Sequence, residues 1–140
     1  MTEKHKLLLL KDLSARLPYD TIVKFNNGKY FEDIKLKNCN ITDVEDGYEP
    51  KPYLRPLANM TADERKELAT LCDMHMYCRD IGYDGINIMT NLYDKQIYYT
   101  NLVNMEAIDW LNAHHFDYRG LIEMGLAIKV TEENNPYKNV

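Results

Sequence analysis

The chain lacks the features that define several large classes of protein. Its 140 residues include three cysteines and one tryptophan, and no apolar run approaches the roughly 20 residues that cross a bilayer. The short run Leu7–Leu10 lacks the longer apolar core and cleavage site of a secretory signal. An odd number of cysteines without such a signal favours reduced thiols over a disulfide framework. We therefore expect a cytoplasmic protein with no membrane partner.

The chain also lacks an excess of basic charge. It has 17 Lys and Arg against 22 Asp and Glu, which gives a net charge of −5. Affinity for a phosphate backbone comes largely from clustered Lys and Arg, so a nucleic-acid polymer is not the expected partner. A small anionic ligand remains open, because one or two arginines can hold it. A chain of this length is expected to fold as a single domain over residues 1–140.

The familiar enzyme motifs are missing as well. The sequence has no GxSxG, GxxxxGK[ST], GxGxxG or HExxH pattern. Catalytic sites also assemble from residues far apart in sequence, so this observation favours a non-enzyme without deciding the matter. We expect no cofactor and no catalytic residue, and we keep as an alternative a small hydrolase that uses His114 or His115 as a base.

The N-terminal half predicts a helix followed by a small antiparallel sheet. Apolar residues at helical spacing predict a helix over Leu8–Leu17, which Pro18 would end. Thr21–Asn26 is rich in strand-forming residues, and Asn27-Gly28 predicts a type I′ hairpin turn into a return strand that starts near Lys29. A further strand is expected over Asn40–Val44. Curling of this sheet could give a partial barrel.

The middle of the chain begins with a proline-rich segment, YEPKPYLRPL, whose prolines predict an extended edge or a rigid connector rather than a central strand. Thr61 and Glu64 form a capping box, so a helix should begin there and run to about Ile81. Gly82–Val103 is harder to interpret. Two short apolar alternations, 86–88 and 97–99, suggest a second hairpin.

The C-terminal part predicts two helices and a strand. Asn104 is a candidate N-cap for a helix over Met105–His115, and Asp117 could cap a short helix that ends at Gly125. The segment LAIKV then predicts a final strand, and residues 131–140 should form a flexible tail. The expected fold class is α+β, with an N-terminal helix, a central helix and C-terminal helices around a small antiparallel sheet.

Cys72, His75 and Cys78 would lie on the central helix, where three soft ligands raise the question of a zinc site. At about 100° per residue, positions i and i+6 diverge by roughly 120° around a helix. Compact zinc sites use turns or His at i and i+4 instead. We therefore favour core packing and predict no metal.

The stretch WLNAHHFDYRGLI, from Trp110 to Ile122, gathers most of the candidate binding residues. His114 lies four residues after Trp110, so the two rings can stack, while His115 is expected to continue the buried stripe of the helix. Arg119 would stand at a helix start, where a positive charge needs an acid or an anion beside it. An internal carboxylate and an anionic ligand are both open as its partner.

Tyrosine is the one unusually frequent aromatic residue, with 11 copies against three Phe. Its flat face and hydroxyl suit wet grooves and interfaces. Arg55 lies in the rigid, Tyr-rich segment beside Tyr53, and Arg119 follows Tyr118. Aromatic and arginine side chains together suit a nucleotide pocket, with rings for the base and Arg for phosphate. The predicted ligand-binding residues are Tyr53, Arg55, Trp110, His114, Tyr118 and Arg119.

Three segments carry a resemblance. KPYLRPLANMTADE (51–64), IDWLNAHHFDYRGLIEMGLAIKV (108–130) and DLSARLPY (12–19) resemble a family of uncharacterised small proteins of gut bacteria and their phages. The resemblance implies a phage or mobile-element origin, and it carries over no functional residue.

These observations together predict a non-enzymatic, phage-associated binding protein in the host cytoplasm. The leading hypothesis is that it sequesters a small nucleotide-type signalling ligand and so counters host defence. The alternative is a protein–protein interaction module that binds a host protein. Either version could be a homo-oligomer.

Overall fold

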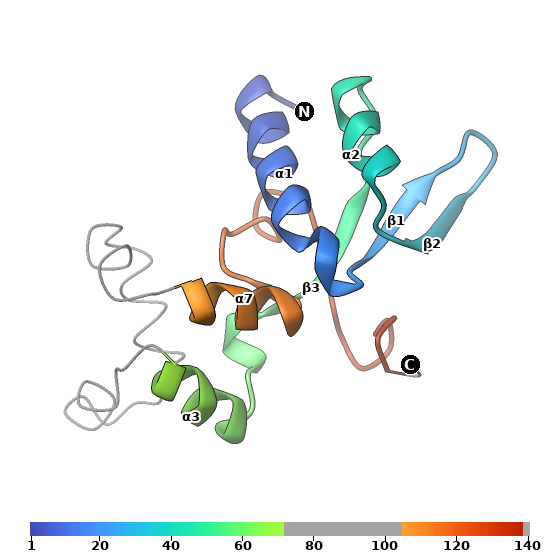
Figure 1. Ribbon diagram of the computed structural model, residues 1–140. Helices are drawn as coiled ribbons and strands as arrows, with labels where there is room; N and C mark the ends of the chain where they lie inside the picture. Colours follow the sequence, from blue (N-terminus) through green and yellow to red (C-terminus); the bar gives the residue numbers. More distant parts are fainter. Residues whose placement is uncertain (72–104, 139–140) are drawn as a thin grey trace. The chain divides into compact units, whose positions relative to one another are not determined.

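The computed structural model describes residues 1–71 and 105–138 of the chain (Figure 1). Within these residues it has four α-helices and five short strands, which confirms the α+β class. The sheet is open and mixed rather than purely antiparallel. None of the helices in the described part of the chain has both the length and the apolar character that crossing a bilayer would require.

Contacts divide the chain into two units, which are described separately. The first unit comprises Met1–Arg55 with Arg119–Val140, and the second comprises Pro56–Tyr118. The expectation of a single domain is not tested by this division and stays a prediction.

Helix α1 (Glu3–Arg16) opens the first unit and begins five residues earlier than predicted. The hydroxyl of Thr2 accepts a hydrogen bond from the backbone N–H of His5 at 3.1 Å, which satisfies one of the free amides at the helix start. Leu9 and Leu13 lie on its buried side. The helix ends where the 3₁₀ turn Leu17–Tyr19 places Pro18, as the proline predicted.

Strands β1 (Ile22–Asn26) and β2 (Phe31–Lys35) form the predicted hairpin, with Asn26 opposite Phe31. The prediction of a type I′ turn at Asn27-Gly28 is wrong. The loop spans 27–30, and only Gly28 of the pair has a positive φ. Asn26 Oδ1 accepts from the N–H of Gly28, and Asn27 Oδ1 accepts from the N–H groups of Lys29 and Tyr30. The asparagine side chains thus supply the acceptors that shape the longer loop.

The strand predicted over Asn40–Val44 is wrong, since this segment lies in helix α2 (Asn38–Glu45). Asn40 Oδ1 accepts a hydrogen bond from the backbone N–H of Lys37 at 2.9 Å, closing the first turn. Val44 then reaches the core from the helix. A local cap outweighed the strand preference of the β-branched residues. Helices α1 and α2 pack against each other (Figure 1).

The proline-rich segment forms β3 (Lys51–Pro56), which has a strand on each side. Val23 and Lys24 of β1 pair with it antiparallel, and β5 (Ile128–Lys129) pairs with it parallel, Tyr53 opposite Ile128. The prediction that this segment forms an edge strand or a connector is therefore wrong. Each pairing is only two residues long, so the missing N–H groups of the prolines interrupt little of the ladder. β5 confirms the predicted final strand.

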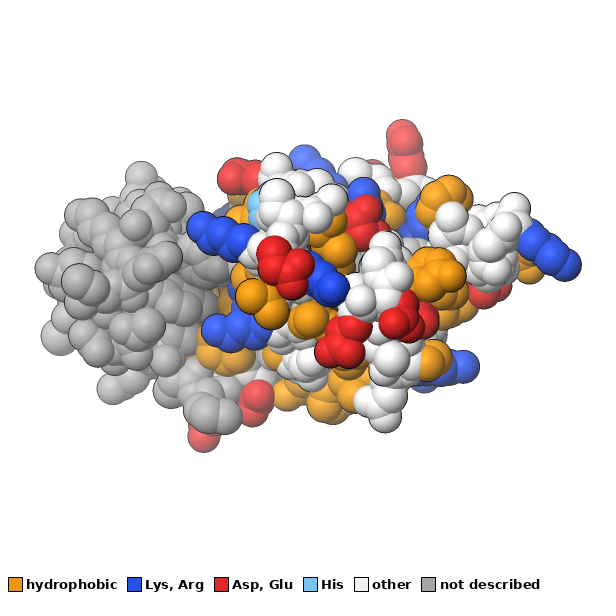
Figure 2. Space-filling model, turned by 90° about the horizontal axis from the view of Figure 1, so that it is seen from above, with side chains coloured by type: hydrophobic (Ala, Val, Ile, Leu, Met, Phe, Trp, Pro, Cys, Tyr) orange, Lys and Arg blue, Asp and Glu red, His pale blue; other side chains and the backbone are white. Residues whose placement is uncertain are grey.

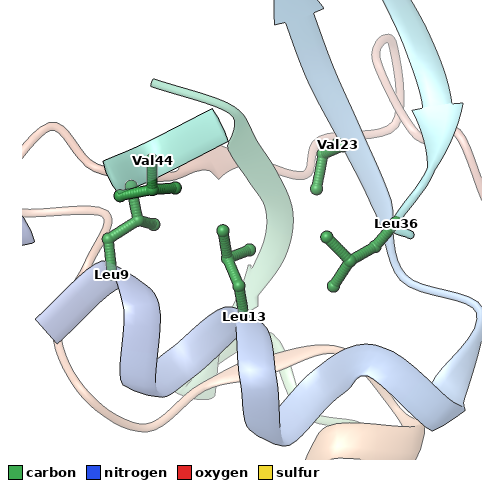
Figure 3. Close-up of a cluster of buried hydrophobic side chains, with 5 residues drawn as sticks. All are labelled: Leu9, Leu13, Val23, Leu36 and Val44. Atoms are coloured by element: carbon green, nitrogen blue, oxygen red, sulfur yellow. The ribbon is translucent and has the colours of Figure 1, made fainter. Parts of the chain in front are cut away.

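Two apolar clusters fill the first unit. One joins α1, α2 and the hairpin (Figure 3), and its buried members are Leu9, Leu13, Val23, Leu36 and Val44. The other lies around β3 and the C-terminal segment and contains Leu54, Leu121, Leu126 and Ala127.

The second unit contains the 3₁₀ turn Leu57–Asn59, α3 (Ala62–Leu71), α7 (Met105–Ala113) and β4 (Phe116–Asp117). The capping box is confirmed: the N–H of Thr61 donates to Glu64 Oε1 at 2.9 Å, and the N–H of Glu64 donates to Thr61 Oγ1 at 3.1 Å. Helix α3 packs against α7. The continuation to Ile81, the second hairpin, Asn104, and Cys72, His75 and Cys78 lie outside the described residues.

The end of α7 differs from the prediction of a helix through His115. The helix stops at Ala113, and His115 adopts the left-handed conformation with φ 63°. The chain can then turn into β4, which also replaces the start of the short helix predicted from Asp117. Such a left-handed residue ends a helix in the way a C-terminal glycine often does.

Only the glycine cap of that predicted short helix is present. Residues 121–125 form turns, and Gly125 has φ 74°. The N–H of Leu126 donates to the carbonyl of Leu121 and that of Gly125 to Ile122, which is the Schellman pattern. Beyond Thr131, where a flexible tail was expected, residues as far as Lys138 are described, and Tyr137 makes hydrogen bonds to two strands.

Candidate functional site

The buried charges of the first unit centre on Asp12. Its carboxylate is fully buried, and Oδ2 accepts a hydrogen bond from Arg16 Nε at 2.8 Å within α1. Oδ1 accepts from Arg119 Nη1, also at 2.8 Å, from 107 residues away in sequence. Of the two partners left open for Arg119, the structure shows the internal carboxylate. Removing one member of such a buried ion pair strongly destabilises a protein, because the other charge is left buried without its partner.

Tyr53 stands in β3 with its ring almost fully buried. Its hydroxyl donates to Asp33 Oδ1 at 2.8 Å, and Lys24 Nζ lies 5.7 Å from the ring centroid. Burial raises the pKa of Tyr53, and the hydrogen bond to Asp33 adds to the rise. The hydrogen bond with Tyr53 in turn raises the pKa of Lys24. These three side chains link the first three strands of the sheet.

Tyr137, which the sequence interpretation missed, binds the C-terminal segment to two strands. Its hydroxyl donates to the Tyr53 carbonyl at 2.8 Å and accepts from the N–H of Ile22 at 3.0 Å. Burial raises the pKa of this phenol well above its usual range. The surrounding run is polar and contains proline, so its composition gave no signal of this contact.

Trp110 is the centre of an aromatic stack in the second unit. The His114 ring lies 4.1 Å from its centroid at 26°, as the spacing predicted, and Phe116 lies 5.8 Å away at 13°. His114 Nδ1 is also 2.9 Å from the carbonyl of Trp110. The indole is 8% exposed, and its N–H is buried without a hydrogen-bond partner among the described residues.

The remaining predicted residues are placed as follows. Tyr118 is buried, and its hydroxyl donates to Asn112 Oδ1 at 2.8 Å. Arg55 is half-buried in β3. Tyr53, Arg55 and Arg119 belong to the first unit, whereas Trp110, His114 and Tyr118 belong to the second.

Of the six predicted residues, Trp110 and His114 stack on each other. Tyr53, Arg119 and Tyr118 instead use their polar groups within the protein, on Asp33, Asp12 and Asn112 respectively. Whether all six bind one ligand stays a prediction.

A different feature of the first unit has the form of a binding surface. A groove of about 400 Å³ runs beside the outer face of α1, and its lining side chains are Lys4, His5, Leu7, Leu8, Lys11 and Met124. Leu7 is 61% exposed and Met124 is 43% exposed, so the apolar part of the groove is open to solvent. We call this surface the α1 groove. Figure 2 shows basic, acidic and hydrophobic side chains intermixed on the upper face of the described part of the molecule.

The sequence interpretation missed the α1 groove because it began the first helix at Leu8. Thr2 as an N-cap would have started the helix early enough to place Lys4, Leu7, Leu8 and Lys11 on one face, at positions i, i+3, i+4 and i+7. Met124, from far along the chain, could not have been found this way.

Among the described residues, no group of three or more His, Cys, Asp or Glu side chains is placed to hold a metal ion. Comparison of the chain with protein-family models, with curated proteins and with solved structures found no match.

Proposed function

We propose that this protein is a non-enzymatic binding protein that recognises another protein through the α1 groove. The observation that carries the proposal is the solvent-exposed apolar floor formed by Leu7 and Met124 beside a hollow of about 400 Å³. A single exposed leucine needs no explanation, but here two exposed apolar side chains from distant parts of the chain line one hollow together with two lysines, which supports an interaction site.

The resemblance of three sequence segments to small phage and gut-bacterial proteins supports a host protein as the partner. A phage-encoded binding protein of this kind would act in the host cytoplasm, and blocking a defence protein would be its use to the phage. This part of the proposal depends on the resemblance alone.

A photo-crosslinking amino acid at Leu7 tests the site. In lysate of a host bacterium, we expect it to give one stoichiometric protein adduct that Met124→Glu abolishes. The same amino acid at Ser14, an exposed position of α1 that does not line the groove, is the control. Equal adducts from both positions, or none from Leu7, would refute the proposal.

The nucleotide-type ligand remains a second candidate, and the Trp110–His114 stack favours it. His114 is half-exposed and lies flat on the indole at 4.1 Å, so a base could take its place on that face. Because Arg119 already holds Asp12, the phosphate would need another cation or backbone N–H groups.

A thermal-shift and calorimetry panel of cyclic and ADP-ribose-type nucleotides tests this second candidate. A ligand bound only by the folded state raises the melting temperature in proportion to its saturation. No shift with any of them would exclude it. Native mass spectrometry of the purified protein would show the oligomeric state in the same preparation.

A further inference from the structure

We propose that the partner of the α1 groove is an acidic amphipathic helix in which two carboxylates seven residues apart flank two apolar residues. This inference rests on the proposed function and names the chemistry of its partner. All the residues involved belong to the first unit.

The spacing of the groove residues along α1 indicates a helical partner. Lys4, Leu7, Leu8 and Lys11 form one stripe, with a lysine at each end and two leucines between. At 1.5 Å per residue, the two lysines are separated by about 10 Å along the helix axis. A helix laid along α1 has the same rise, so acids at its positions i and i+7 can meet both lysines while residues i+3 and i+4 meet the apolar floor.

The charge of the groove indicates an acidic partner. The protein has a net charge of −5, yet the groove is lined by two lysines and a histidine and by no acid. Glu3 precedes Lys4 and Glu123 precedes Met124 in the sequence, but neither glutamate lines the groove. Neither Lys4 nor Lys11 has an ion pair with any other residue in the described ranges. The start of α1 adds the positive end of the helix dipole on the same side.

These charges also select against other partners. A second copy of the chain docked groove to groove would bring lysines against lysines, and like charges at an interface suppress such pairing. A basic partner would be repelled by the two lysines of the groove. An acidic helix is therefore the partner whose charge complements this groove.

The test uses the full-length protein and two fluorescent helical peptides. One carries Glu-x-x-Leu-Leu-x-x-Glu, and the other is identical except that Lys replaces both Glu. In anisotropy titrations at low salt, we expect the acidic peptide to bind at least tenfold more tightly. Its affinity should fall as salt is added, because exposed charge pairs are screened.

Reversing the charge of the groove makes the test specific. The double variant Lys4→Glu/Lys11→Glu should prefer the basic peptide, whereas the matched control Lys29→Glu, at an exposed position in the 27–30 loop, should keep the preference for the acidic one. All three substituted lysines are exposed, and circular dichroism verifies that the variants fold.

The results distinguish failure of the acidic-helix inference from failure of the proposed function. Failure of the double variant to reverse the preference overturns the acidic-helix inference, as does binding to anionic lipid vesicles or to a nucleotide in place of the acidic peptide. If Leu7 still crosslinks to one protein while the peptides show no charge preference, the proposed function stands and only this inference fails. If Leu7 gives no adduct, the proposed function fails.

Discussion

Replacing Asp12 by asparagine should cost more stability than any exposed charge change in the first unit. The carboxylate is fully buried and accepts hydrogen bonds from two guanidinium groups, each at 2.8 Å. Asparagine has almost the same shape, so the substitution removes the charge and one acceptor oxygen with little change in packing.

The size of this stability loss depends on the two arginines that lose the Asp12 carboxylate. Arg16 is fully buried, and its positive charge would lose the carboxylate that balances it. Arg119 is 16% exposed and could turn partly toward water. Removing one partner of a buried ion pair costs about 3–5 kcal/mol. Because the amide oxygen of the introduced asparagine would still accept one hydrogen bond, we expect a loss of about 3 kcal/mol, a large part of the roughly 5–15 kcal/mol of a typical domain.

Urea unfolding followed by circular dichroism measures this loss. Asp20→Asn is a matched control, because Asp20 pairs with Lys35 at 3.2 Å but the two side chains are 77% and 60% exposed. Asparagine also tolerates the left-handed conformation of Asp20, φ 55°. An exposed pair contributes about 0–1 kcal/mol, so the control should unfold at nearly the wild-type urea concentration. If Asp12→Asn lost no more stability than Asp20→Asn, the assignment of a buried charge cluster would be refuted.

Three further predictions concern other parts of the fold. Leu13→Ala should cost about 2–5 kcal/mol in urea unfolding because Leu13 is fully buried, and the same change at exposed Leu7 should cost less than about 0.5 kcal/mol; equal losses would mean that the burial of α1 is assigned to the wrong face. The pKa of Tyr137 is raised in the folded protein, so the folded state keeps this proton after the unfolded chain has lost it, and stability should fall as the pH rises above about 10. Tyr137→Phe should make that decline less steep, and an unchanged pH profile would contradict the buried phenol. Thr61→Ala should lower the thermal stability by about 1 kcal/mol through loss of the cap of α3, and Thr61→Ser should restore it.

Local patterns in the sequence predicted the parts of the fold that depend on near neighbours. The capping box of Thr61 and Glu64 and the stacking of His114 on Trp110 each involve residues three or four apart, and both were found as predicted. The prediction over Asn40–Val44 failed although its cap is local too, because β-branched residues suggested a strand and the Asn40 cap was not weighed.

The remaining errors have long-range causes. The proline-rich segment became a central strand because a partner strand, β5, arrives more than 70 residues later in the chain. Arg119 pairs with the carboxylate of Asp12, 107 residues earlier in α1. Nothing in the sequence indicated that these two segments meet. The α1 groove needs Met124 beside the first helix. Sequence periodicity does not report which distant segments meet, so these features had to come from the structure.

The division of the chain gives the first unit an unusual order of assembly. Its two parts are separated by the whole of residues 56–118, and β3 acquires its parallel neighbour only when residues 128–129 are available. Tyr137 closes the unit by joining the C-terminal segment to Ile22 and Tyr53. During synthesis, α1, α2 and the hairpin can pack on one another early, whereas β3 must wait for residues 128–129 to leave the ribosome. A truncated product that stops before β5 would carry Asp12 without Arg119, and would be a substrate for proteases rather than a smaller working version of the protein.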